Sequence, residues 1–152
     1  MKYFNFIIIK DTFTSIIKFK KMNKKIISSA ALLGMIAIIL GAFGAHALKK
    51  VLTIEQLATF ETGVRYQMYH ALFLLFIGTN NLITEKRKNK IYNLTLLGVI
   101  FFSGSIYLLA TNSLLPFDFK TFGFITPIGG VFLISAWFLL FFDLIKPIKK
   151  EK

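Results

Sequence analysis

Four long apolar runs divide this sequence, and no other feature restricts its fold as strongly. They cover residues 26–48, 66–83, 91–110 and 122–145. About 20 apolar residues in a helix cross the hydrocarbon core of a bilayer, so each run is close to the length of one span. The chain has 152 residues, 55% of them hydrophobic, which is too apolar for a soluble domain of this size. The sequence therefore predicts an all-α membrane protein, a four-helix antiparallel transmembrane bundle.

The basic residues indicate how these spans are oriented. Of the nineteen lysines and arginines, fifteen lie before the first run, between the second and third, or after the fourth. The remaining segments hold only Lys49, Lys50, Arg65 and Lys120. Cytoplasmic loops of membrane proteins carry an excess of Lys and Arg. We therefore expect a multi-pass protein of the bacterial plasma membrane with both termini in the cytoplasm.

The net charge of +12 and the absence of cysteine exclude several classes of protein. A basic patch on a polar domain would suggest nucleic acid, but these basic residues flank the spans, where they contact anionic headgroups. We expect membrane lipids as partners, with a homo-oligomer or another membrane protein as further partners, and no nucleic acid. Without cysteine there is no disulfide, no thiolate nucleophile and no Cys-based metal site.

Residues 1–21 form a basic N-terminal extension, for which two interpretations stay open. Five apolar residues recur there at helical spacing with lysines between them: Phe6, Ile9, Phe13, Ile16 and Ile17. This pattern fits a surface-lying amphipathic helix. The other interpretation, which the sequence favours, is that translation starts at Met22, because a basic lead-in directly before an apolar run is sufficient for targeting. Residues 22–152 then form the four-span membrane domain.

The first run also has the outline of a cleaved signal peptide, since Ala45-His46-Ala47 matches an A-x-A cleavage site. A signal peptide has an apolar region of about 7–15 residues. The run at 26–48 is longer and reaches about 34 Å as a helix. Its length favours retention as a membrane span.

Small residues gather on one face of the first run: Ala30, Gly34, Ala37, Gly41 and Gly44. In lipid, such a face lets a neighbouring helix approach closely. The third and fourth runs carry small residues seven positions apart: Gly98 with Ser105, and Gly129 with Ala136. We expect these positions to be helix-packing surfaces.

The segment before the second run predicts a helix that begins outside the membrane. Thr53-Ile54-Glu55-Gln56 matches a capping box, in which Thr and Gln side chains satisfy free amides at a helix start. Apolar residues then follow at helical spacing without a proline. The sequence therefore predicts one long helix over 54–83, with its first turns at the outer surface.

Two histidines are the main candidates for chemistry in the spans. His46 ends the first run and His70 lies one turn into the second, so we expect both near the outer surface and close to each other, with Tyr66 beside His70. The first interpretation is a structural cluster whose hydrogen bonds join two helices. A metal site is an alternative, although a closed site takes about four ligands. Haem held by both histidines is a second alternative. We expect no resident cofactor or metal.

Signatures of enzymes are missing from the sequence. It has no Gly-rich phosphate loop, no Ser-His-acid arrangement and no paired carboxylates within a span. A proton-coupled exporter is expected to bury an acidic residue midway through a span, whereas Asp118 falls in a loop and Asp143 at the end of the fourth run. We therefore expect no catalytic residues, and a drug exporter is disfavoured.

Two motifs in the chain resemble a known family. They are Gly41-Ala42-Phe43-Gly44-Ala45-His46-Ala47-Leu48 and Phe60-Glu61-Thr62-Gly63-Val64-Arg65-Tyr66-Gln67-Met68-Tyr69-His70-Ala71-Leu72. This pair resembles the domain of unknown function 423 family of small bacterial membrane proteins, related to the eukaryotic transmembrane protein 256. The resemblance extends from about Met22 to Ile145. It implies a small multi-spanning inner-membrane protein, supports Met22 as the start, and carries no established reaction.

The resemblance also marks a set of motif positions without assigning them a role: His46, Gly63, Tyr66, Gln67 and His70. The family usually has glycine after the histidine of the first motif, where this chain has Ala47, which weakens any requirement for left-handed backbone there. The sequence thus predicts a small integral inner-membrane protein of unknown activity, non-enzymatic, acting by helix packing or by binding a partner or lipid. A haem- or metal-binding redox protein using His46 and His70, and a small transporter or channel, are the alternatives.

Overall fold

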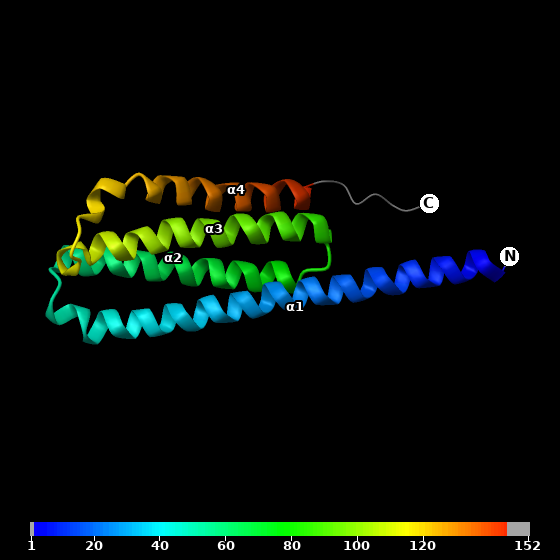
Figure 1. Ribbon diagram of the computed structural model, residues 1–152, viewed down its shortest axis with the longest axis horizontal. Helices are drawn as coiled ribbons and strands as arrows, with labels where there is room; N and C mark the ends of the chain where they lie inside the picture. Colours follow the sequence, from blue (N-terminus) through cyan, green and yellow to red (C-terminus); the bar gives the residue numbers. More distant parts are fainter. Residues whose placement is uncertain (1, 146–152) are drawn as a thin grey trace.

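The computed structural model describes the backbone of residues 2–145 and the side chains of residues 21–145. Within residues 2–145 all regular secondary structure is helical, and there is no strand. Its four α-helices are α1 (Lys2–His46), α2 (Ile54–Thr79), α3 (Glu85–Ala110) and α4 (Ile125–Ile145). Three short 3-10 turns lie at Leu48–Lys50, Asn112–Leu114 and Phe119–Phe122. The α1–α2 and α3–α4 connections lie at one end of the molecule and the α2–α3 connection at the other (Figure 1).

Three segments are long and apolar enough to cross a membrane: Lys21–Lys50, Glu85–Ala110 and Phe119–Ile145. They confirm the first, third and fourth predicted runs as candidate spans. The second run stays a prediction, because α2 is not among these segments: even its more apolar part carries Arg65, Gln67 and His70.

The bounds of the helices differ from the predicted ones at two places. The helix predicted over 54–83 ends at Thr79, because Asn80 adopts an extended backbone and its side chain accepts a hydrogen bond from the amide of Leu82 at 2.7 Å. At the other end of the chain, α1 begins at Lys2, so residues 2–20 continue the helix of the first run. The side chains of residues 1–20 lie outside the described residues, and both interpretations of the extension stay predictions.

The predicted capping box at the start of α2 is confirmed. The Thr53 hydroxyl accepts from the amide of Gln56 at 3.2 Å, and the Gln56 side chain accepts from the amide of Thr53 at 2.9 Å. The Gln56 side-chain amide also donates to the Ser113 hydroxyl at 3.3 Å. The α1–α2 and α3–α4 connections are therefore joined at their shared end. Ala47, where a left-handed backbone was in question, is right-handed, with φ −88°.

The small residues of α1 lie against α2. A side-chain carbon at Gly34 would contact Ala71 at 3.7 Å, and one at Gly44 would lie 3.3 Å from the ring of Phe60. Gly41, between them, faces Val64. Ala30 and Ala37 on the same face are fully buried.

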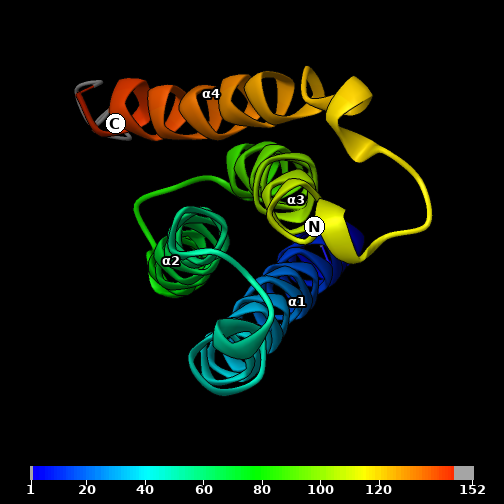
Figure 2. The ribbon, with the colours of Figure 1, turned by 90° about the vertical axis from the view of Figure 1, so that its left-hand side faces the viewer.

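Among the glycines of the described residues, Gly129 lies closest to the backbone of another helix, where α4 packs on α3. A side-chain carbon at Gly129 would lie 2.3 Å from the backbone nitrogen of Phe102, and one at Gly98 would lie 2.4 Å from the Leu133 side chain. The hydroxyls of Ser105 and Thr126 add a hydrogen bond of 2.7 Å between the same helices. Seen along the bundle, α4 lies across α3 on the side away from α1 (Figure 2).

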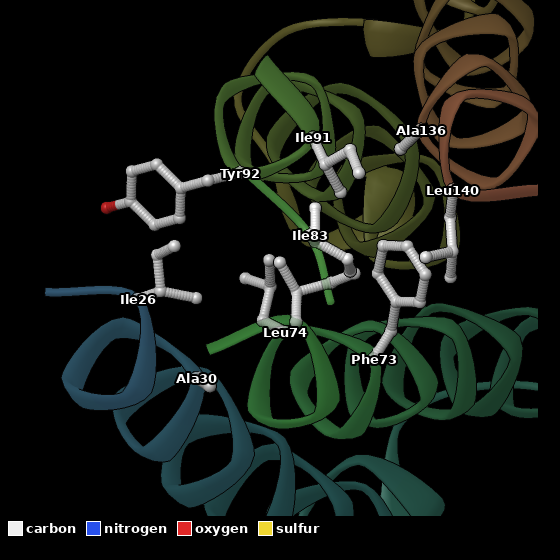
Figure 3. Close-up of a cluster of buried hydrophobic side chains, with 10 residues drawn as sticks. Ile26, Ala30, Phe73, Leu74, Ile83, Ile91, Tyr92, Ala136 and Leu140 are labelled. Carbon is white, nitrogen blue, oxygen red and sulfur yellow. The ribbon is translucent and has the colours of Figure 1, made fainter. Parts of the chain in front are cut away.

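The main apolar core lies toward the α2–α3 connection and draws side chains from all four helices (Figure 3). Its buried members are Ile26, Ala30, Phe73, Leu74, Ile77, Ile83, Ile91, Tyr92, Ala136 and Leu140. Tyr92 fills this core while its hydroxyl shares a hydrogen bond of 2.9 Å with the hydroxyl of Ser29. The phenol therefore keeps a polar partner at a buried position.

The close approach of α3 and α4 at Gly129 generates a testable prediction. Gly129→Ala should lower the free energy of unfolding by about 1–3 kcal/mol, because the added methyl forces two backbones apart. Gly104→Ala is the matched control, since nothing lies within 4 Å of a side-chain carbon at Gly104. Equilibrium unfolding in mixed micelles measures both variants. Equal stabilities for the two would contradict the described packing.

Candidate functional site

His70 joins α2 to α4 and is only 5% exposed. The indole N–H of Trp137 donates to His70 Nε2 at 3.3 Å. An indole nitrogen can only donate, so Nε2 is unprotonated and the ring proton of the neutral imidazole is on Nδ1. That nitrogen donates to the backbone carbonyl of Tyr66 at 2.8 Å. Both ring nitrogens are therefore engaged within the protein.

Gln67, one turn before His70, joins α2 to both of its other neighbours. Its side-chain N–H donates to the carbonyl of Leu33 in α1 at 2.9 Å, and its side-chain oxygen accepts from the hydroxyl of Tyr107 in α3 at 2.9 Å. The side chain is only 4% exposed. A buried amide is costly unless it is hydrogen-bonded, and here each end of the amide has a partner on a different helix.

Gly63 makes room for the ring that reaches Gln67. A side-chain carbon at Gly63 would lie 2.7 Å from the ring of Tyr107. Gly63, Gln67 and His70 follow one another at helical spacing, so they share a face of α2. This face connects α2 with α1, α3 and α4.

Tyr66, the remaining motif residue of α2, is 41% exposed. Its ring packs on Phe102, with 4.7 Å between ring centroids, and lies nearly parallel to the ring of His70 at 6.4 Å. The Tyr66 hydroxyl makes no hydrogen bond to any described residue. Of Gly63, Tyr66, Gln67 and His70, Tyr66 is the one whose side chain is both polar and accessible.

Tyr66 and His70 line the α2 side of a groove between α2 and α4, floored by Phe102 of α3, with a volume of about 650 Å³. We call it the α2–α4 groove. It forms because α4 packs mainly along α3 and reaches α2 through Trp137, which contacts His70 and the ring of Phe73. The other residues that line it are apolar: Phe102, Gly130, Leu133, Ile134, Trp137, Phe138 and Phe141.

The expectation that His46 and His70 lie close together is wrong. His46 is exposed at the end of α1, two residues beyond Gly44, which faces Phe60. His70 lies near the level of Gly34, which faces Ala71. Twelve residues of α1 separate these levels, about 18 Å along the helix axis. Two imidazoles so far apart cannot ligate one metal ion or the two faces of one haem, so the shared-ligand alternative is contradicted.

No group of three or more His, Asp or Glu side chains within residues 21–145 is placed to hold a metal ion. Of the predicted cluster, Gln67 and His70 are hydrogen-bonded to neighbouring helices and Gly63 and Tyr66 lie beside them, whereas His46 lies apart.

Neither Tyr107 nor Trp137 was predicted from the sequence as a site residue. Each brings a hydrogen-bond donor into an apolar run, where water is excluded and the donor must find an acceptor within the protein. The polar side chains of the second motif, Gln67 and His70, are those acceptors. A search for isolated hydrogen-bond donors in one apolar run and isolated acceptors in another would have pointed to Tyr107 and Trp137.

The link between Gln67 and Tyr107 can be tested by a double-mutant cycle. Gln67→Leu and Tyr107→Phe should each cost about 0.6 kcal/mol of unfolding free energy and at most about 1.7 kcal/mol, the average and the maximum for hydrogen bonds between membrane helices. The double variant should cost less than the sum, because both changes break one shared bond. Tyr66→Phe combined with Gln67→Leu is the control and should be additive. Additivity in both cycles, measured in mixed micelles, would rule out the bond.

Comparison with known proteins places the chain in a family. A family model described as "Protein of unknown function (DUF423)" matches residues 40–130. The UPF0382 membrane protein SSP2132 of Staphylococcus saprophyticus is 42% identical over 117 residues, which cover 77% of this chain and 93% of that protein. The UPF0382 inner membrane protein YgdD of Escherichia coli K12 is 34% identical over 116 residues, 73% of this chain and 82% of that protein.

No solved structure matches the chain. The matched region contains both sequence motifs and all of α2 and α3. The names of the relatives give a membrane location and no reaction. The resemblance seen in the two motifs is thereby confirmed: the chain belongs to the DUF423 family, whose UPF0382 members are membrane proteins of unknown function.

Proposed function

We propose that this protein is a non-enzymatic, four-span protein of the bacterial plasma membrane whose α2–α4 groove holds the acyl chain of a bilayer lipid. Its helices run antiparallel, and both termini are cytoplasmic. The observation that carries the proposal is the apolar groove at membrane depth. The length and polarity of α2 support the fourth span, and the shape and chemistry of the groove support the binding of a lipid.

Length and the direction of its polar groups support α2 as the fourth span. Its 26 residues reach about 39 Å, more than the hydrocarbon core requires. Gln67 and His70 are turned inward and paired, whereas Tyr69, Leu72 and Phe76 are exposed. This is the pattern of a helix with lipid outside and protein inside. The basic residues at the start of α3 favour the cytoplasm for the α2–α3 connection.

The topology can be tested with single cysteines, because the natural chain has none. Lys50→Cys lies between α1 and α2, and Asn81→Cys lies between α2 and α3; both positions are exposed. A membrane-impermeant maleimide should label Cys at position 50 in spheroplasts and at position 81 only in inverted vesicles. Labelling of both positions from one side would show that α2 does not cross.

The length and the lining of the groove suit an acyl chain. Along α4 the lining extends from Gly130 to Phe141, about 16 Å of helix axis. The groove has a volume of about 650 Å³, and apart from Tyr66 and His70 its lining is apolar. An apolar slot of this length on the side of the bundle suits an extended hydrocarbon chain.

The chemistry of the lining favours binding over catalysis. His70 is its only imidazole, and both ring nitrogens are already hydrogen-bonded. A general base needs a free nitrogen within hydrogen-bond reach of its substrate. The free Tyr66 hydroxyl on the α2 side suits the polar part of an amphiphile whose chain continues toward Phe141 over aromatic and aliphatic side chains.

The groove can be tested with the fluorescence of Trp137, which is the single tryptophan of the chain and lines the groove. Phospholipid with brominated acyl chains, added sparingly to the protein in detergent, should quench Trp137 at low mole fraction. Gly130→Leu places a side chain in the groove without a clash, since its first carbon would lie 3.7 Å from the Phe102 ring. That variant should bind the lipid about tenfold more weakly, because about 1.4 kcal/mol of apolar contact is lost.

Gly104→Leu is the matched control, because the same substitution there meets open space outside the groove. It should leave the quenching curve unchanged. Equal curves for the natural protein and both variants would overturn lipid binding in the groove. A dimer that is present in the natural protein and lost only in Gly130→Leu would instead assign the groove to a second copy of the chain.

A further inference from the structure

A polar pocket lies at the start of α3, at the end of the bundle where α2 and α3 are connected. Four residues line it: Thr84, Lys86, Arg87 and Lys90, and its volume is about 260 Å³. Three of the four are basic. The groove and this pocket share no lining residue.

The basic side chains of the pocket lack enough acidic partners among the described residues. Arg87 pairs with Asp143 of α4 through its Nε at 2.9 Å, the only ion pair recorded within residues 21–145. Lys86 and Lys90 are four residues apart on one helix, where two like charges destabilise each other. An anion bound between them would remove this repulsion. The terminal N–H groups of Arg87 remain to donate to it, because a guanidinium has five donors.

Lys88 adds a further positive charge beneath the pocket. It is fully buried, and its Nζ donates to the side-chain oxygen of Asn23 in α1 at 2.9 Å. Of the charged residues between 80 and 92, four are basic and only Glu85 is acidic. The start of α3 is therefore strongly cationic, although one of its cations is shielded inside the bundle.

The position of the pocket identifies the anion. α3 is long and apolar enough to cross a membrane, so its first turns lie where the hydrocarbon meets the headgroups. Leu82, two residues before Thr84, is 75% exposed and offers an apolar surface next to the cations. A cationic pocket with an adjacent apolar side chain at interface depth matches a phosphate linked to acyl chains.

We infer that Lys86, Arg87 and Lys90 bind the phosphate of an anionic glycerophospholipid, whose chains lie beside Leu82. This site rests on the crossing of the membrane by α3 and does not require the α2–α4 groove to be occupied. The groove selects for an acyl chain, whereas the pocket selects for the charge of the headgroup. The two sites are therefore separable by experiment.

The test compares phosphatidylglycerol with phosphatidylcholine on the full-length protein in non-ionic detergent, with native mass spectrometry to count bound lipids. The natural protein should prefer phosphatidylglycerol, and the preference should fall as salt rises. Lys86→Gln/Lys90→Gln should weaken phosphatidylglycerol binding about thirtyfold, from the interaction of two lysines with an anionic lipid. Both side chains are exposed, so the pair should still fold, which thermal unfolding verifies.

Lys49→Gln/Lys50→Gln is the matched control, with the same charge change at exposed lysines of the other end. It should keep the preference. An equal loss of phosphatidylglycerol binding in the two double variants would overturn a specific site. Equal binding of phosphatidylglycerol and phosphatidylcholine by the natural protein would overturn it too. If millimolar inorganic phosphate competes for the pocket and acyl chains add no affinity, the ligand of the pocket is a soluble anion and not a lipid. Gly130→Leu should weaken both lipids alike, so failure of the groove and failure of the pocket give different results.

Discussion

Hydrogen bonds that α2 makes with its neighbours are the interaction on which the rest of this structure depends. Inside a bilayer no water can satisfy a polar group, so each buried donor needs an acceptor within the protein. Gln67 meets this requirement on α1 and α3, and His70 meets it on α4. Small residues then let the helices come close enough for these bonds to form, as Gly63 does beneath the ring of Tyr107. Polar pairing and close packing thus support each other.

The same packing leaves the two surfaces to which we assign binding. Because α4 follows α3 closely at Gly129, it diverges from α2 and leaves the α2–α4 groove with Trp137 across it. At the start of α3, Arg87 is drawn to Asp143, and Lys86 and Lys90 remain exposed. One surface is apolar and the other cationic, so each matches a different part of a phospholipid. Neither surface requires chemistry at the histidines.

Much of the fold could be predicted from particular residues. The capping box at Thr53 specifies the start of α2, and the small residues from Ala30 to Gly44 mark the face of α1 that α2 covers. The prediction for the histidines was wrong for a physical reason. Both were placed near the outer surface by their distance from helix ends, but α2 begins well before its apolar run, and its early turns occupy the level of His46. His70 consequently lies deeper in the bundle.

The sequence by itself determined the all-helical class, three candidate spans, the family and the motif residues, because apolar length, capping and short motifs are local properties of the chain. Only the tertiary structure decided which side chains meet. The partners Tyr107 and Trp137 lie forty and sixty-seven residues from their acceptors, and helical spacing carries no information on which face of a distant helix is turned inward. The groove and the pocket likewise arise from the divergence and approach of whole helices, which depends on packing across the entire bundle.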